Sequence, residues 1–169
     1  MIALHWLAGA LILELIVHGW IMVHGGSSAA TAFGLYQSHK SIGFVALALT
    51  AARLILRLSR KSPPEPDSAR WERRLAGAVQ AALYALTLVA IVAGWLVVST
   101  SPLPIPTRFF GLFVVPNIAR ADAALFAAAV VAHRLAAWSI ACLVGLHVAG
   151  AFKHHFVDRD DVLIRMLPR

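Results

Sequence analysis

The last apolar stretch of the chain decides the fold, and over residues 121–156 it reads ADAALFAAAVVAHRLAAWSIACLVGLHVAGAFKHHF. Two histidines, His133 and His147, lie fourteen residues apart within it. On an α-helix this spacing corresponds to about 3.9 turns and about 21 Å of rise, so both imidazoles leave nearly the same face at two depths. One helix can therefore serve two stacked sites, and we expect the rest of the chain to supply each histidine with a partner.

The composition is that of a membrane protein. Hydrophobic residues make up 60% of the 169 residues, charged residues only 14%, and the mean hydropathy is +0.76, which lies outside the range of soluble domains. The formal charge of +7 would suggest nucleic-acid binding in a soluble chain. Here the basic residues flank apolar runs, where they indicate topology and contact with anionic lipid, so we expect membrane lipid and no nucleic acid as a partner. The single cysteine, Cys142, is interpreted as a small buried hydrophobe.

Four segments are long and apolar enough to span a bilayer as helices. They are placed at about residues 2–23, 36–58, 75–98 and 121–156. The prolines expected to end the second helix are Pro63, Pro64 and Pro66. The connection over residues 99–120 is rich in aromatics and prolines and is expected to lie at the outer membrane interface. The chain, residues 1–169, is thus predicted to be a single domain of the all-α class, a four-helix transmembrane bundle.

The distribution of Lys and Arg predicts the orientation of this bundle. Seven of them lie between Arg53 and Arg74 and four between Lys153 and Arg169, against four in the rest of the chain. By the positive-inside rule the middle loop and the tail are cytoplasmic, and an even number of spans places the N-terminus there as well. Because the first apolar run starts almost at Met1, we also expect further, basic residues before it in the complete protein.

The predicted topology orders four histidines by depth. The helix directions place His5 and His147 near the cytoplasmic side, and His39 and His133 near the external side. An ionisable side chain in hydrocarbon is costly unless it is paired or ligates a metal. Two level pairs therefore favour a functional role over the alternative, in which each is a hydrogen-bonded structural histidine.

Paired imidazoles with no cysteine or carboxylate beside them suit axial ligation of a haem iron better than zinc, which takes four protein ligands or keeps a water position. A bis-histidine haem has no vacant position, so one-electron transfer is its expected role. Arg53 lies fourteen residues after His39, on the same helix face at the lower level. We predict that Arg53 pairs with a propionate of the cytoplasmic-side haem.

Other polar residues of the chain have simpler interpretations. Glu14 and His18 share a face of the first helix and are expected to satisfy each other, with a quinone or proton path as the alternative. His24 is expected to be a solvated loop residue, and His154 and His155 to anchor the chain at the interface rather than to ligate. A haem-free sensor or a metal transporter is a further alternative for the function of the whole chain.

Motifs along nearly the whole chain carry a resemblance to a known family. They are Leu4-His5-Trp6-Leu7, His39-Lys40-Ser41-Ile42-Gly43, Arg53-Leu54-Ile55-Leu56-Arg57-Leu58, Gly94-Trp95-Leu96, Phe109-Phe110-Gly111-Leu112-Phe113, the His133/His147 spacing, and the tail from His154-His155-Phe156 to Arg165-Met166-Leu167-Pro168. As a set they resemble the bacterial cytochrome b561 family of four-helix, di-haem inner-membrane proteins.

The resemblance implies two haems b, held by His5 with His147 and by His39 with His133, in a multi-pass protein of the bacterial inner membrane. It implies electron transfer from an external one-electron donor, with superoxide as a candidate, to ubiquinone, which would make the protein an oxidoreductase of the superoxide:ubiquinone type. Close relatives serve as haem-bearing anchors for periplasmic redox proteins. A non-catalytic electron-transfer subunit therefore stays open as the alternative, as does the oligomeric state.

The chain departs from the family pattern at two places. Many relatives carry histidines near the cytoplasmic start of the third helix, where this chain has Gly77 and Gln80 before Tyr84, so a quinone or proton role of those histidines is in doubt here. An acidic residue often follows the external histidine in relatives, where this chain has Arg134. The outer surface is therefore expected to suit a different donor.

Overall fold

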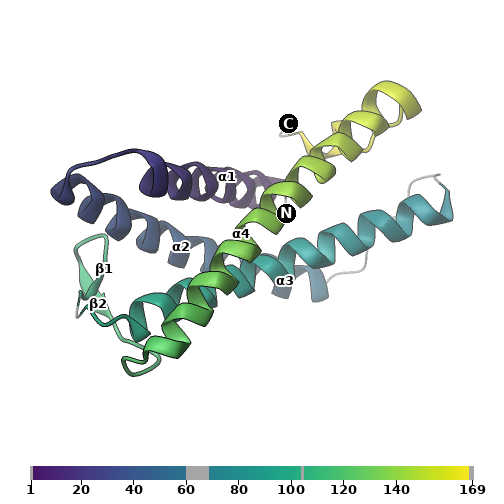
Figure 1. Cartoon of the computed structure of the whole chain (residues 1–169). Coiled ribbons are helices and arrows are strands. Elements are labelled where there is room, and N and C mark those ends of the chain that lie inside the picture. The colour runs from purple at the N-terminus through teal and green to yellow at the C-terminus, as the bar shows by residue number, and fades with distance from the viewer. Residues whose placement is uncertain (1, 60–68, 104, 168–169) are drawn as a thin grey trace.

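The computed structural model describes residues 2–59, 69–103 and 105–167. Its four long helices, shown in Figure 1, are α1 (Ile2–His24), α2 (Ala29–Leu58), α3 (Arg70–Thr100) and α4 (Ala123–Phe152). All four are long and apolar enough to cross a membrane. The predicted fold class, an all-α membrane protein with four spanning helices, is confirmed.

Two helices begin earlier than predicted. α2 starts seven residues before the expected position because Ser28 caps it: the Ser28 Oγ accepts a hydrogen bond from the Thr31 N–H at 3.3 Å. α3 starts at Arg70 instead of residue 75, so the charged turn around Glu72 is helical as well. The prolines predicted to end the second helix, Pro63, Pro64 and Pro66, lie outside the described residues.

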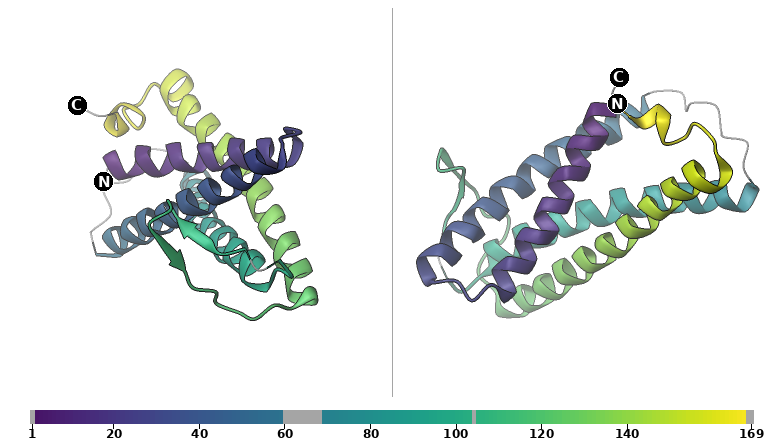
Figure 2. Two further views of the ribbon diagram at one scale, coloured as in Figure 1. Left: turned by 90° about the vertical axis from the view of Figure 1, so that its left-hand side faces the viewer. Right: turned by 90° about the horizontal axis from the view of Figure 1, so that it is seen from above.

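The helices pack as two pairs. α1 lies along α2, and α3 lies along α4, as the right-hand view of Figure 2 shows. The buried residues at the helix contacts are mostly small: Ala8, Ala46, Ala90, Ala93, Ala129 and Ala136. Small side chains let helix backbones approach closely, which is how helices associate in a bilayer without a hydrophobic driving force between them.

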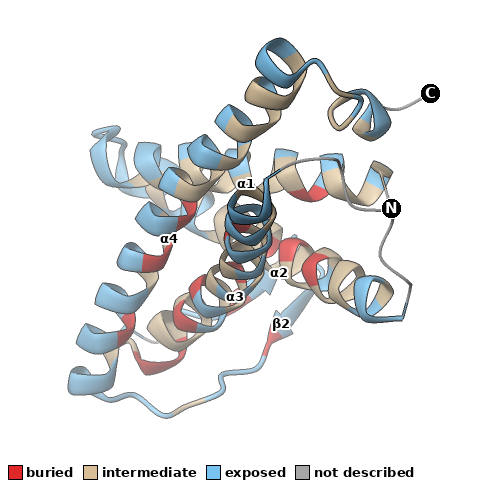
Figure 3. Ribbon diagram, turned by 90° about the vertical axis from the view of Figure 1, so that its right-hand side faces the viewer, coloured by how far each residue is buried: buried red, intermediate tan, exposed pale blue. Residues whose placement is uncertain are grey.

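Large apolar side chains are exposed on all four helices. Figure 3 shows how much of the ribbon consists of exposed positions. In a soluble protein this would be unfavourable, but in a bilayer the lipid tails accept these side chains. The same reason explains why the prediction of a buried Cys142 is wrong. Cys142 is exposed on α4 rather than buried, because an apolar residue of a membrane helix loses nothing by facing lipid.

The connection between α3 and α4 contains a short antiparallel hairpin of β1 (Thr107–Phe109) and β2 (Phe113–Val115). At its turn, Phe110 and Gly111 both have positive φ, 46° and 78°. Two successive residues at positive φ are typical of the type I′ turns of tight hairpins, a conformation that glycine adopts without strain. The sequence predicts an interfacial segment here but not this defined structure.

Two side chains of α2 hold the hairpin. Gln37 donates from Nε2 to a backbone carbonyl just before β1 at 2.9 Å, and its Oε1 accepts from the Arg108 N–H at 3.1 Å. The buried Ser41 accepts at Oγ from the Phe110 N–H at 3.0 Å. Because Gln37 and Ser41 lie on either side of His39 in the sequence, the hairpin fixes the helical turn that carries this histidine.

The two ends of the described chain meet. The Trp6 Nε1–H donates to the Met166 carbonyl at 2.5 Å, so the start of α1 lies beside the C-terminal tail. Lys153, at the end of α4, forms a salt bridge with Glu72 of α3 at 2.9 Å. Both contacts lie at the same end of the bundle. The cytoplasmic location of this end stays a prediction.

The tail begins with a π-helical turn, Lys153–Asp158, after which Arg159 takes a positive φ of 55° and reverses the chain. The reversal brings Asp160 to 2.6 Å from the Nδ1 of His154. Burial acts to raise the pKa of the Asp160 carboxyl, but hydrogen bonds from a backbone amide and from His154, together with the charges of His154 and Arg165, outweigh it and the pKa is lowered. His154 thus has a carboxylate partner, whereas His155 is only half-buried.

Candidate functional site

The structure brings each of the two histidines of α4 next to a histidine of another helix. The ring centres of His5 and His147 are 6.0 Å apart, and those of His39 and His133 are 6.2 Å apart. These are the two pairs expected from depth in the bilayer. Because α4 (Ala123–Phe152) is continuous, its two histidines lie at levels separated by about 21 Å of helix rise.

The separation of the rings fits a metal atom between them. Two metal–nitrogen bonds of about 2 Å each, with about 1 Å from each bonding nitrogen to its ring centre, place two axial imidazoles about 6 Å apart. Both observed separations, 6.0 and 6.2 Å, agree with this value. The rings of the two pairs are inclined by 61° and 80°.

His133 is held in the tautomer that leaves one nitrogen free. Its Nδ1–H donates to the Ala90 carbonyl of α3 at 2.7 Å, so the lone pair of Nε2 is available to a metal. Gly94, one turn along α3, leaves room for the ring: a Cβ at this position would lie 3.1 Å from two atoms of the imidazole. Neither role could be predicted from the sequence, because a backbone carbonyl has no sequence signal and Gly94 is notable there only as part of the Gly94-Trp95-Leu96 motif.

Arg53 lies beside the other pair. Its Nη2 donates to the Nδ1 of His5 at 3.1 Å, and its guanidinium lies over the Tyr84 ring, 5.4 Å from the centre. Its Nε is buried and has no hydrogen-bond partner among the described residues. Ligation through the Nε2 of His5 would require a proton on Nδ1, so Arg53 would then turn to another acceptor. An orphaned guanidinium N–H next to this pair fits an anionic group of a cofactor.

Two residues of α3, Gln80 at one of the departures noted above and the nearby Tyr84, contact arginines of α2. Gln80 accepts at Oε1 a hydrogen bond from the Arg57 Nη1 at 2.7 Å. Tyr84 lies between Arg53 and Arg57, whose guanidinium carbons are 5.4 and 5.9 Å from its ring centre. These two residues therefore stabilise the arginines of α2 from the facing helix.

The prediction that Glu14 and His18 satisfy each other is confirmed by a contact of 2.8 Å between Oε1 and Nδ1. The Nε2 of His18 faces the Ser38 Oγ at 3.4 Å, and the His18 ring centre is 5.6 Å from that of His39. Both nitrogens of His18 are engaged, so it is less suited than His133 to ligate a metal.

The predicted loop position of His24 is wrong, because α1 extends through it. The side chain is exposed, as predicted for a solvated residue. It stacks on Trp20 with ring centres 4.0 Å apart, and its Nδ1 donates to the Trp20 carbonyl at 3.0 Å. His24 thus belongs to the end of the helix and to neither histidine pair.

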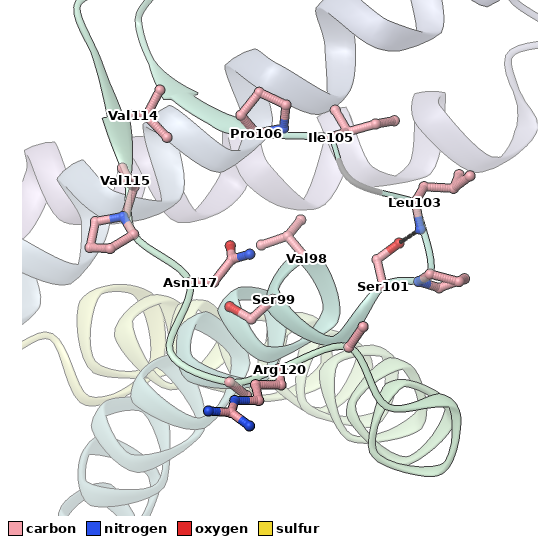
Figure 4. Close-up of a pocket in the computed structure, with 14 residues that line it drawn as sticks. Val98, Ser99, Ser101, Leu103, Ile105, Pro106, Val114, Val115, Asn117 and Arg120 are labelled. Carbon is pink, nitrogen blue, oxygen red and sulfur yellow. Dashed lines mark hydrogen bonds between the residues drawn. The ribbon is translucent and has the colours of Figure 1, made fainter.

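A cavity of about 610 Å³ opens between the end of α3 and the segments around the hairpin (Figure 4). Its walls are mainly apolar and include Val98, Ile105 and Val114, while Asn117 and Arg120 are among its polar groups. None of the four paired histidines lines it. The cavity is therefore a feature of the hairpin connection and not the space between the rings.

Comparison with known proteins adds an independent line of evidence. The family profile described as prokaryotic cytochrome b561 matches residues 1–169. Cytochrome b561 homolog 2 of Escherichia coli (strain K12) is 34% identical over 168 residues, which cover 98% of this chain and 87% of that protein. The probable superoxide oxidase CybB of Yersinia pestis is 27% identical over 172 residues, covering 99% and 93%. This chain, with four membrane-spanning helices, belongs to the prokaryotic cytochrome b561 family, whose members carry haem b and transfer electrons across a membrane.

Proposed function

We propose that the protein transfers single electrons through two bis-histidine haems b in the bacterial inner membrane, from an external donor to ubiquinone. The observation that carries the proposal is the presence of two histidine pairs, with ring centres 6.0 and 6.2 Å apart, at two levels of one helix. In this proposal His39 and His133 hold one haem, and His5 and His147 hold the other. Haem b held by these residues would supply a one-electron couple.

The surrounding residues prepare these ligands. The Ala90 carbonyl fixes the tautomer of His133, and Gly94 keeps space beside its ring. Arg53 offers a guanidinium next to His5, where it would pair with a propionate. The hairpin bound by Gln37 holds the helical turn of His39.

Superoxide is the proposed donor, because one relative is a probable superoxide oxidase. Two superoxide ions give up two electrons and become O₂, while ubiquinone takes up two electrons and two protons to become ubiquinol. In stopped flow, superoxide should reduce the haems of the purified protein, and added ubiquinone should reoxidise them. Superoxide dismutase should abolish the first step, and failure of either step would contradict the superoxide:ubiquinone assignment.

A second candidate is a non-catalytic subunit that passes electrons to or from a periplasmic redox protein. It is favoured by the apolar hairpin side chains of Phe110, Leu112 and Phe113, which are 53%, 78% and 58% exposed. In that case superoxide would not reduce the purified protein, and reduction would require the partner. The same stopped-flow experiment therefore separates the two candidates.

Replacing Arg53 by glutamine should lower the midpoint potential of the haem held by His5 and His147. Because the reduced haem carries one positive charge fewer, the loss of a nearby cation should lower the midpoint potential by on the order of 50–100 mV, for charges about 10 Å apart in a partly buried site. The measurement is a redox titration resolved into two components. Arg53→Lys should keep the midpoint potential close to that of the unmodified protein. Arg57→Gln, which removes the arginine that donates to Gln80, is the matched control. An unchanged potential, or a shift confined to the other haem, would contradict the role.

A further inference from the structure

A second polar site lies within the spanning helices beside the His39/His133 pair. Glu14 and His18 are one helical turn apart on α1 and in contact at 2.8 Å, and Ser38 of α2 lies 3.4 Å from the other nitrogen of His18. The proposed haem ligation uses none of these three residues. Ionisable groups at membrane depth are costly and commonly mark a functional site.

One oxygen of this site has no partner. The Oε1 of Glu14 contacts His18, but the Oε2 is buried and has no hydrogen-bond partner in the part of the chain that the structure describes. Leaving a buried carboxyl oxygen unpaired is unfavourable, so a hydrogen bond between this oxygen and a ligand would stabilise the complex. The site thus offers one unused hydrogen-bonding position.

The Oε2 itself is buried, but the Glu14 side chain borders the bilayer and its carboxyl group can turn toward it about the last torsion. The side chain of Glu14 is 40% exposed, whereas that of His18 is 12% exposed. The neighbouring Leu13 and Val17 are more than half exposed and present an apolar surface of α1 to lipid. A ligand for Glu14 would therefore be an amphiphile that arrives through the membrane with a polar oxygen at its head.

The site also lies next to a proposed haem ligand, His39. The ring centre of His18 is 5.6 Å from that of His39, and a Cβ on Gly19 would lie 3.7 Å from the His39 ring. A hydrogen-bonding site with a proposed haem ligand, His39, on one side and lipid on the other suits a redox-active molecule that dissolves in the membrane. Among membrane amphiphiles, this describes a quinone.

We propose that Glu14, held by His18, binds the head group of a membrane quinone at its Oε2. A protonated carboxyl would donate to a quinone carbonyl, and a carboxylate would accept from a quinol hydroxyl, so one oxygen serves both forms of the ligand. The inference rests on the proposed function, which makes ubiquinone the acceptor, and adds the place where its head group lies. That place is at the level of the His39/His133 pair and not at that of His5 and His147.

Photolabelling of the unmodified holoprotein tests the location directly. The protein in lipid nanodiscs is illuminated with an azido-ubiquinone, digested and mapped by mass spectrometry. Labels are expected on the middle of α1 around Glu14 and on the start of α2 around Ser38. Labels found only elsewhere, or labels displaced equally by excess phosphatidylglycerol, would overturn the proposal, the latter by indicating a general lipid site.

Variants test the role of the carboxyl. Glu14→Leu should weaken the binding of decylubiquinone about tenfold or more, because a hydrogen bond to a charged or buried group is lost. Glu14→Gln retains a donor and an acceptor and should bind more tightly than Glu14→Leu. Glu72→Gln, which removes a carboxyl at the tail end of α3, is the control and should bind like the unmodified protein. Dissociation constants are measured by titration calorimetry at equal haem content.

The outcomes separate the site from the proposed function. If the unmodified protein binds decylubiquinone at Glu14 but ubiquinone does not reoxidise its haems, the proposed function fails and the quinone site stands. If ubiquinone reoxidises the haems and Glu14→Leu leaves the dissociation constant unchanged, the function stands and this site is wrong.

Discussion

Replacing His133 by alanine is expected to remove about one of two haems per protein and to leave the other in place. His133 is one of two rings whose centres are 6.2 Å apart, and His39 alone would hold a five-coordinate haem weakly. The pair of His5 and His147 lies at the other level of α4 and should keep its haem. The measurement is a pyridine-haemochrome assay combined with protein quantification.

The controls for this prediction use the other histidines. His39→Ala should give the same loss as His133→Ala, and a double variant of these two should lose no more than either one. His24→Ala removes an exposed histidine at the end of α1 and should retain both haems. Full retention of haem in both His39→Ala and His133→Ala would contradict the pairing.

Replacing Gly94 by alanine should disturb the same haem, although Gly94 ligates nothing. The added Cβ would lie 3.1 Å from the Cε1 and Nδ1 of His133, closer than ordinary contact, and would push the ring away from the Ala90 carbonyl. We expect a changed low-spin electron paramagnetic resonance signal of one haem and reduced occupancy at that site. Gly94→Val, with two more methyl groups, should cause the larger loss.

Gly77 provides a matched control on the same helix. A Cβ at Gly77 has nothing within 4 Å, so Gly77→Ala should leave both haem signals unchanged. Each Gly→Ala change in a helix also adds about 0.5–1 kcal/mol of intrinsic stability, which the control removes from the comparison. Equal spectra for the Gly94→Ala and Gly77→Ala proteins would contradict the role of Gly94 as the space beside His133.

Much of the fold and the pairing follows from one-dimensional patterns. Apolar runs of sufficient length predict four spans, and the end of α2 at Leu58 agrees with the predicted end of its run. The fourteen-residue spacing places His133 and His147 on one face, and the positive-inside rule supplies the helix directions that match them with His39 and His5. The structure brings these pairs together within 6.0 and 6.2 Å.

The parts of the fold that were not predicted correctly lie where local interactions override these patterns. The start of α2 depends on the Ser28 cap, which extends the helix into a stretch that reads as a loop. The hairpin has strands of three residues, too short for an alternating pattern to be recognised, and Phe110 occupies a positive φ that its residue type does not predict.

The sequence by itself determined the number of spans, the two depths on α4 and the four histidines, because hydrophobic length, helical period and charge bias are properties of the chain read in one dimension. Only the tertiary structure decided which groups surround those histidines: the Ala90 carbonyl, the space at Gly94, Arg53 against His5 and the unpaired oxygen of Glu14. These contacts depend on the rotation and separation of neighbouring helices. In a bilayer, the rotation and separation of the helices are set by the packing of small residues from different segments, so they cannot be predicted from any one segment alone.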